Sequence, residues 1–293
     1  MTKESCTHEG GHHKDVCSHK QIGEILNQVN TGYFDTFDTS RGHHNPHLVC
    51  VACADARVMP ALLLSKNPGD ILLNKPLGGF LPKKLEDSKN LSAWFSLAVG
   101  MKKIPEVVLI SHSDCAAGNM SLKYPSAKNL PRKHPEYKNI RSIQKYLSSI
   151  GADLPKLSKM VLEQAEGEEH AATDLMTKIL SVFSLKNLMN YKVCENQSET
   201  VGQAVAAGKM NVVLIYIDLE KKSLEYFDSN TGDFVPMTKE TPAQPTVLSE
   251  GKDNIGLFRH LPQPELPLPL PDPGKKEGGL SPPSFKNKGD LKF

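Results

Sequence analysis

Two short segments carry the residue types that metal-assisted chemistry needs. The first reads Cys-Ala-Asp-Ala-Arg from Cys53, and the second reads His-Ser-Asp-Cys from His112 to Cys115. Thiolate and imidazole are preferred ligands of zinc, and three protein ligands leave a fourth position for water. We predict that Cys53, His112 and Cys115 bind one zinc ion per chain. Taken singly, each could instead be a buried thiol or a satisfied core histidine.

Asp55 and Arg57, two residues apart in the first segment, form the predicted catalytic pair. A carboxylate and a guanidinium at this spacing can make a charge-assisted, often bidentate contact. The aspartate then stays ionised and turns an acceptor oxygen toward a zinc-bound water. Without Arg57, Asp55 could swing in as a fourth ligand. Whether Asp55 rests on Arg57 or on the metal is left open by the sequence.

The elements that must position these segments are buried strands that alternate with helices. Continuous apolar strands separated by helices predict a mostly parallel sheet covered on both faces, and both segments then follow carboxyl strand ends, where ligands bind in α/β sheets. We expect an α/β fold of about five strands, with an antiparallel hairpin at one edge. The expected strands are 47–52, 70–73, 107–110, 211–217 and 223–227, and the clearest helices are 91–101 and 175–189.

Three regions of different composition divide the chain. Residues 1–20 are rich in Cys and His and predict a mobile arm, followed by a helical pattern around 22–29. Residues 21–235 predict the α/β domain, with an insertion at about 121–170 that contains a helix around 143–150. Residues 236–293 are rich in proline, which favours an extended tail. The tail could bind a protein partner, although an unstructured tail is the simpler interpretation.

The composition excludes several classes of protein. The 293 residues carry a formal net charge of +2, with basic residues scattered among acidic ones, so nucleic acid is not an expected partner. No apolar stretch reaches the ~20 residues that span a bilayer, and the polar N-terminus lacks a secretory signal. Six cysteines are too sparse for a disulfide scaffold. We therefore expect a soluble cytoplasmic protein.

The paired motifs, Cys-x-Asp-x-Arg followed by His-x-x-Cys, resemble those of the β-class carbonic anhydrases. The resemblance covers roughly residues 20–235, interrupted by 121–170. It implies that Cys53, His112 and Cys115 are the zinc ligands and that Asp55 and Arg57 are the catalytic pair. The implied reaction is hydration of carbon dioxide to bicarbonate by a zinc-bound hydroxide. The resemblance also implies a homodimer or larger homo-oligomer whose active-site cleft is completed at the subunit interface.

The chain departs from the family pattern near the site. Ala56 stands where the family usually has Ser, Ala116 and Ala117 replace a Gly-Gly pair, and residues 74–77 replace Arg-Asn-Ala-Gly. The added methyl groups restrict φ if either position needs a positive value. Two alternatives follow. The substrate could be another small linear molecule, carbonyl sulfide or carbon disulfide, or the chain could be a non-catalytic zinc protein that binds partners.

Other candidate residues receive simpler interpretations. Asp114 lies inside the second motif but is expected to cap backbone amides, so it is left out of the catalytic set. Cys50 is three residues before Cys53, on what should be the opposite face of the strand, and is interpreted as an inert core thiol; Cys194 is interpreted in the same way. Residues that could capture a second metal or transfer protons are Cys6, His8, His12, His13, Cys17, His19, His43, His44 and His47.

Overall fold

The computed structural model describes residues 46–66, 69–126, 133, 135–194 and 198–238. The predicted arm, the helical pattern around 22–29 and the chain from residue 239 onward lie outside the described residues. Among the described helices, none is long and apolar enough to cross a membrane. The helices are α2 (Pro60–Leu63), α3 (Lys89–Phe95), α4 (Ala116–Lys123), α5 (Tyr137–Ser149), α6 (Leu154–Gln164), α7 (Glu169–Met189) and α8 (Val201–Ala206).

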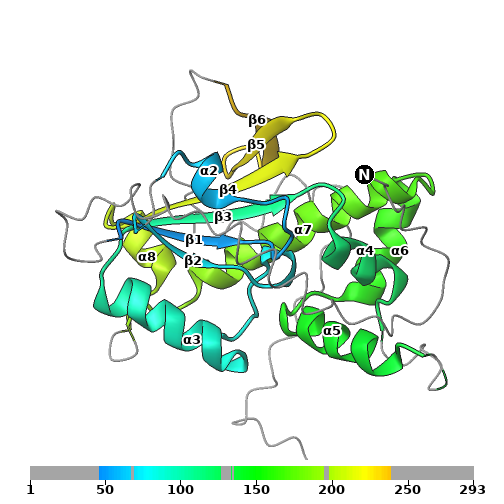
Figure 1. Ribbon diagram of the computed structural model, residues 1–293, viewed down its shortest axis with the longest axis horizontal. Coiled ribbons are helices and arrows are strands. Elements are labelled where there is room, and N and C mark those ends of the chain that lie inside the picture. The colour runs from blue at the N-terminus through cyan, green and yellow to red at the C-terminus, as the bar shows by residue number, and fades with distance from the viewer. Residues whose placement is uncertain (1–45, 67–68, 127–132, 134, 195–197, 239–293) are drawn as a thin grey trace, which may run out of the picture.

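A six-stranded sheet forms the centre of the fold (Figure 1), in the order β2-β1-β3-β4-β5-β6. Strands β1 to β4 are parallel, and β5 and β6 add an antiparallel edge. The predicted α/β class with a mostly parallel sheet is therefore confirmed. The strands are β1 (Leu48–Ala52), β2 (Ile71–Asn74), β3 (Glu106–His112), β4 (Asn211–Asp218), β5 (Ser223–Asp228) and β6 (Asp233–Pro236).

Strand β6 is a sixth strand, in addition to the five that the sequence predicts. It is four residues long and ends at Pro236, so it has little of the apolar alternation that identifies a strand in sequence. Its Phe234 ring packs edge-on against Phe227 of β5, with ring centroids 5.5 Å apart. Phe234 also contacts Tyr216 of β4, at 5.7 Å. Aromatic packing across the sheet thus holds an edge strand whose own sequence signal is weak.

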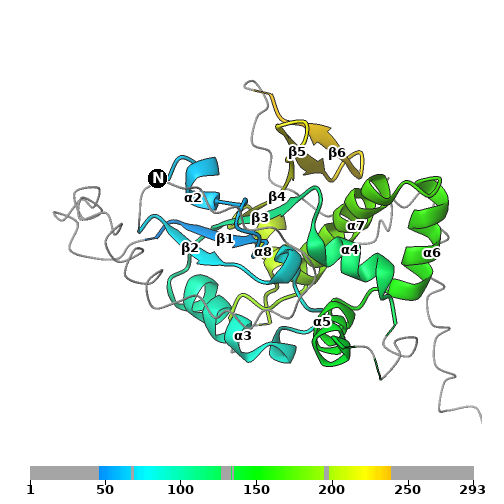
Figure 2. The same ribbon diagram turned by 45° about the vertical axis from the view of Figure 1, so that its right-hand side comes forward.

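Side chains of alternating strand residues enter two separate cores because the sheet is covered on both faces. Val49 and Val51 of β1 face a core shared with α3, α8 and the C-terminal half of α7. Cys50 and Ala52 face a second core shared with α4, α5, α6 and the N-terminal half of α7. Figure 2 shows α3 and α8 on one side of the sheet and α2 on the other.

The predicted helix at 91–101 is two pieces in the structure. The α-helix ends at Phe95, and Ser96–Met101 continues as a π-helix, a geometry that is rare in proteins. The predicted insertion, in which the sequence indicates at least one helix, has two in the structure. It contains α5 and α6, two amphipathic helices joined at Gly151, whose φ of +83° suits glycine.

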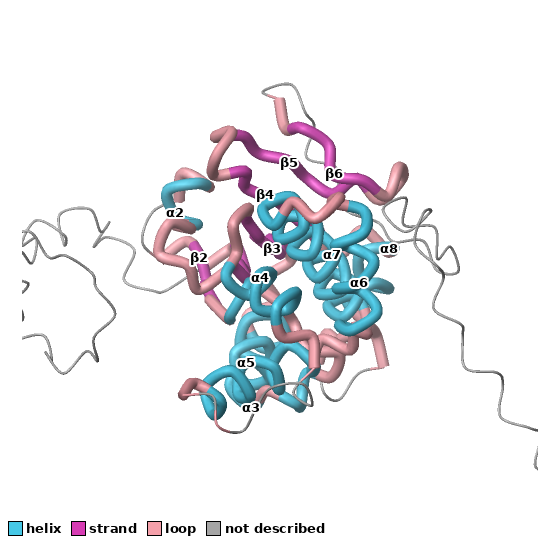
Figure 3. The backbone as a smooth tube through the Cα atoms, turned by 90° about the vertical axis from the view of Figure 1, so that its right-hand side faces the viewer, coloured by secondary structure: helices cyan, strands magenta, loops and turns pink. Residues whose placement is uncertain are grey.

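Helices α4, α5 and α6 gather beyond the carboxyl ends of the parallel strands (Figures 1 and 3). Gly118 allows α4 to approach α7 closely, since a Cβ at this position would lie 2.1 Å from Thr177 Oγ1 and 3.0 Å from the Thr173 carbonyl oxygen. Ser158 of α6 donates a hydrogen bond to the Leu122 carbonyl of α4. The start of α4 is thereby fixed beside the ends of β1 and β3.

Candidate metal centre

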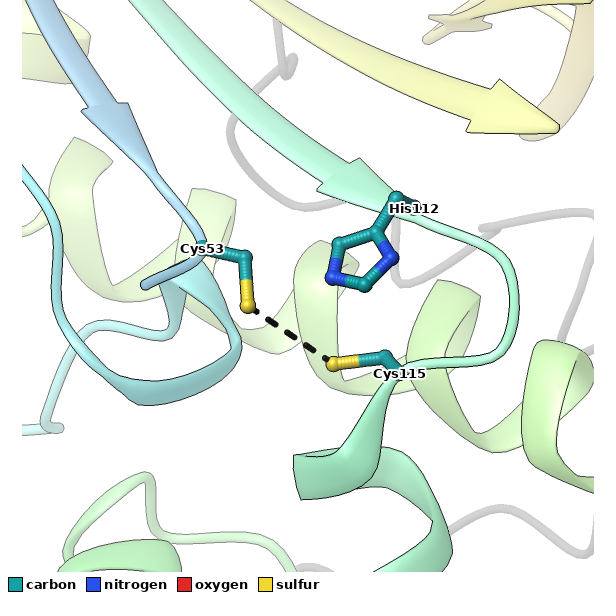
Figure 4. Close-up of side chains that lie close together, drawn as sticks. All are labelled: Cys53, His112 and Cys115. Carbon is teal, nitrogen blue, oxygen red and sulfur yellow. Dashed lines mark hydrogen bonds between the residues drawn. The ribbon is translucent and has the colours of Figure 1, made fainter. Parts of the chain in front are cut away.

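Parallel register brings the two predicted motifs to neighbouring strand ends. In the ladder between β1 and β3, Ala52 lies opposite Ile110, so the residues that follow both strands leave the same edge of the sheet. Cys53 comes immediately after β1, His112 is the last residue of β3, and Cys115 directly precedes the first turn of α4. Figure 4 shows the three side chains pointing toward one another.

The three predicted ligands form a compact buried cluster. One ligand atom from each of Cys53, His112 and Cys115 lies within 4.8 Å of the other two. The two sulfur atoms are 3.9 Å apart. Zinc–sulfur bonds of about 2.3 Å in a tetrahedral centre place two sulfurs roughly 3.8 Å apart. The cluster therefore has the donor atoms and the spacing of a site that could hold zinc.

The tautomer of His112 also suits metal binding. Its Nδ1 lies 2.7 Å from the Ser113 carbonyl oxygen, which can only accept, so the proton is on Nδ1. Its Nε2 is buried and has no hydrogen-bond partner among the described residues. A ligating histidine usually donates its other ring N–H to a backbone carbonyl or carboxylate, which fixes the ring. The buried Nε2, facing two thiols, is therefore a polar atom whose partner a metal ion would supply.

The thiols influence one another electrostatically. The bond from the Cys115 thiol lowers the pKa of Cys53, and the amide of Asp55 at 3.4 Å from Cys53 Sγ adds to this effect. The same bond raises the pKa of Cys115, and burial raises it further. Burial lowers the pKa of His112, but Cys53, the Ser113 carbonyl and Asp55 together outweigh burial and raise it overall. Of the two thiols, Cys53 therefore has the lower pKa.

Asp55 and Arg57 meet in the geometry that their spacing predicts. Arg57 donates from Nε to Asp55 Oδ1 at 3.0 Å, from its second terminal nitrogen to Oδ2 at 2.8 Å, and from its backbone amide to Oδ1 at 2.8 Å. These bonds hold the pKa of Asp55 far below its usual range. Asp55 Oδ2 also lies 3.8 Å from His112 Nε2, too far for a hydrogen bond. The carboxylate stays ionised beside the ligand atoms.

Asp114 contacts the catalytic pair, a role different from the backbone capping that the sequence predicts for it. Its carboxylate accepts a hydrogen bond from Arg57 at 3.0 Å. Its carbonyl oxygen accepts a second bond from the same guanidinium at 3.2 Å. Arg57 is therefore held between Asp55 and Asp114, and both aspartates raise its pKa. The position of Asp114 between two predicted ligands is the signal in the sequence that could have suggested this.

Lys75 occupies one of the positions where the chain departs from the family pattern. Its amine donates to the carbonyl oxygens of Asp55 at 3.0 Å and Val58 at 2.8 Å. The Val58 amide in turn donates to the Asp55 carbonyl, which closes a turn after the first motif. Lys75 therefore fixes the backbone that carries Asp55 and Arg57.

The substituted alanines lie in ordinary backbone. Ala116 and Ala117 form the first turn of α4, and neither has a positive φ. The methyl group of Ala117 is accommodated by Gly78, since a Cβ at Gly78 would lie 2.9 Å from it. The backbone restriction expected from replacing two glycines therefore does not arise here. Ala56 is exposed on the loop after β1, between the two members of the catalytic pair.

Cys50 is buried in the core, with a pKa raised by burial to about 12. The prediction that it faces away from Cys53 is wrong. Cys50 and Cys53 pack in the same core, because β1 ends at Ala52 and the strict alternation of a strand stops there. Cys50 is nevertheless outside the ligand cluster. Cys194 is partly exposed and lies outside the ligand cluster as well.

Gly79 allows the loop after β2 to approach the ligand cluster closely, and its replacement is expected to lower the stability of the fold. A Cβ at this position would lie 2.8 Å from the Ile110 carbonyl oxygen and 3.0 Å from the Cys53 amide, and its φ is +70°. We expect Gly79→Ala to lower the free energy of unfolding by roughly 2–4 kcal/mol, from backbone strain plus overlap. Urea denaturation measures this change.

Gly208→Ala is the matched control. Gly208 has a φ of +68°, and a Cβ added there would meet nothing within 4 Å. The substitution isolates the cost of the left-handed backbone, about 1–2 kcal/mol. Equal destabilisation by the two substitutions would contradict the close approach of the loop to Cys53.

Comparison with known proteins agrees with this geometry. The sequence profile of the carbonic anhydrase family matches residues 48–224. A carbonic anhydrase from Pseudomonas aeruginosa is 23% identical over 194 residues, covering 66% of this chain and 79% of the relative.

Among solved structures, the β-carbonic anhydrase CcaA superposes with a TM-score of 0.62 at 19% identity, covering 78% of this chain and 95% of that one. The Coccomyxa β-carbonic anhydrase in complex with acetazolamide gives a TM-score of 0.50 at 18% identity, covering 75% and 85%. The profile spans more than half of the chain, and its matched region contains all five predicted site residues. This chain belongs to the β-class carbonic anhydrase family of enzymes.

Proposed function

We propose that the chain catalyses the reversible hydration of carbon dioxide to bicarbonate. The observation that carries the proposal is the buried Cys53, His112 and Cys115 cluster beside an aspartate that Arg57 keeps ionised. Membership of the carbonic anhydrase family supports it. A purely structural zinc site would not need the aspartate–arginine pair.

Cys53, His112 and Cys115 would hold the metal, and each fits that task. Zn²⁺ held there supplies a Lewis acid that lowers the pKa of a bound water from 15.7 toward about 7. The Ser113 carbonyl fixes the ring of His112 by accepting from Nδ1. Burial of both sulfurs keeps competing water away from the ligands.

Asp55 and Arg57 would orient the reacting water. An ionised carboxylate can only accept hydrogen bonds, so Asp55 offers an acceptor to a water proton and directs the oxygen lone pairs toward the substrate. Arg57 keeps that carboxylate ionised and fixes its orientation beside the ligand cluster by bonding both of its oxygens. Preorganised charge of this kind lowers the barrier without reorganisation during the reaction.

Stopped-flow hydration of carbon dioxide by the purified, zinc-loaded chain tests the proposal, with the chelator-stripped protein as control. Fast hydration that is lost on stripping and returns with zinc would support it. A zinc-loaded chain with no rate above the stripped control would refute it. Hydrolysis assays with carbonyl sulfide and carbon disulfide would then distinguish another small linear substrate from a non-catalytic zinc protein.

We further propose that the chain acts in the cytoplasm as a homodimer or larger homo-oligomer. The described cysteines are all free thiols, as in a reducing compartment. Strand β2 is an edge strand of the sheet, and Leu73 on it is exposed. Met59 and Leu62, which follow the first motif, are also exposed, at 56% and 71%. Sedimentation of the purified chain measures its oligomeric state, and a monomer at micromolar concentration would contradict the proposal.

A further inference from the structure

The loop between His112 and Cys115 is tied to α7 through one carboxylate. Asp114 adopts a left-handed backbone conformation, with a φ of +52°, which is uncommon for a residue other than glycine. Its amide donates a hydrogen bond of 2.8 Å to Asp174 Oδ1, on the first turns of α7. Asp174 thus accepts a hydrogen bond from the Asp114 amide, which points toward α7 in this conformation.

The same conformation directs Asp114 toward the catalytic pair. Its carboxylate and its carbonyl oxygen both accept hydrogen bonds from Arg57, which also donates to Asp55 from Nε and its second terminal nitrogen. The contacts form a continuous chain from Asp174 through Asp114 and Arg57 to Asp55. Each link is a charged hydrogen bond or one to a charged group, and such bonds are the stronger ones in proteins.

The loop also has an anchor outside this series of contacts. The loop is anchored independently at Ser113, whose amide donates to the Ile217 carbonyl and whose hydroxyl accepts from the Leu219 amide. The ion pair between Arg57 and Asp114 is exposed, with 48% and 60% of the side chains accessible. Exposed pairs of this kind contribute little to stability. What the chain of contacts does fix is the direction in which the guanidinium faces.

We propose that Asp174 is a positioning residue, which acts through Asp114 and Arg57 to keep both oxygens of the Asp55 carboxylate bonded to the guanidinium beside the ligand cluster. This inference rests on the proposed function for its effect on rate, but its effect on the geometry of the metal centre can be measured separately. Without Asp174, Asp114 can leave the left-handed conformation. Arg57 then loses the hydrogen bonds to Asp114 and keeps only those to Asp55. The Asp55 carboxylate is less firmly oriented as a result and can approach the position of the metal.

Three variants in the full-length, metal-loaded protein test the proposal. Asp174→Ala removes the acceptor, whereas Asp174→Asn keeps an acceptor oxygen and should rescue. Glu169→Ala is the matched control, because Glu169 joins the same helix to α4 through Asn119 at 3.0 Å and Lys123 at 2.8 Å without touching the loop.

The first readout is the visible absorption spectrum of the Co²⁺-substituted protein, which reports the ligands around the metal. We expect the spectrum to change in Asp174→Ala and to stay as in the wild type in Asp174→Asn and Glu169→Ala. The second readout is carbon dioxide hydration, for which we expect Asp174→Ala to lower kcat by about 10-fold, the low end for outer-shell partners of a metal site, with KM changed little.

A double substitution tests the path. Asp114→Gly removes the carboxylate at a position where glycine adopts a positive φ freely. The backbone amide at 114 can still donate to Asp174 in that background, and its carbonyl can still accept from Arg57. Asp174→Ala should therefore have a smaller effect on the spectrum and on kcat than in the wild type, since coupled residues are not additive. Fully additive effects would contradict a path from Asp174 through Asp114 to Arg57.

Two further outcomes would overturn the proposal. One is a wild-type Co²⁺ spectrum in Asp174→Ala. The other is an equal loss of thermal stability and kcat in Asp174→Ala and Asp174→Asn, which would indicate a structural role. If the wild-type chain does not hydrate carbon dioxide, the proposed function fails, and the Co²⁺ spectra still decide whether Asp174 positions the site.

Discussion

Replacing Cys115 with alanine is expected to abolish zinc binding and carbon dioxide hydration together. The substitution leaves Cys53 and His112 as two ligands in a site built for three. Loss of an outer-shell partner of a metal site already costs roughly 10–100-fold in affinity or activity, and loss of a ligand should cost more. Zinc content by atomic absorption and hydration by stopped flow, on the same preparation, measure both effects.

Cys50→Ala is the matched control for this substitution. Cys50 and Cys115 are both buried thiols in the same core, and Cys50 is outside the ligand cluster. Its replacement should lower stability slightly while leaving one zinc per chain and the full rate. If Cys115→Ala retained zinc and activity at the level of Cys50→Ala, the assignment of Cys115 as a ligand would be wrong.

Strand positions and the ligand cluster could be predicted because both depend on local sequence and a general rule of topology. The apolar runs at 48–52, 106–112 and 211–218 are largely buried, so each is recognisable as a continuous strand. Parallel strands bring their carboxyl ends to one edge, which is enough to place Cys53 near His112. The position of Cys115 then follows from its three-residue spacing.

Tertiary contacts of polar residues could not be predicted in this way. The bond from the Asp114 amide to Asp174 joins residues 60 positions apart, and no periodicity marks either residue. In the sequence Lys75 is only a departure from the family pattern, and its contacts with two backbone carbonyls appear only in the structure. The compensation between Ala117 and Gly78 likewise depends on how closely α4 approaches the loop after β2.

Arg57→Ala should separate the chemistry of the site from its capacity to hold metal. Arg57 contributes no ligand, so the variant should still bind one zinc per chain. Asp55, however, loses the side-chain bonds that fix both of its oxygens and that depress its pKa most strongly. We expect the hydration rate to fall by roughly 10–100-fold, as for other outer-shell partners, and stopped flow with parallel zinc analysis measures this.

Arg57→Lys and Arg141→Ala make the interpretation specific. Lysine keeps the positive charge of Arg57 but lacks the planar guanidinium that donates to two aspartates at once. Arg57→Lys should therefore recover only part of the hydration rate that Arg57→Ala loses. Arg141 is exposed on α5, and its replacement should change nothing. Full activity in Arg57→Ala would mean that Asp55 needs no partner. Such a result would indicate that catalysis depends on the three metal ligands and not on the aspartate–arginine pair.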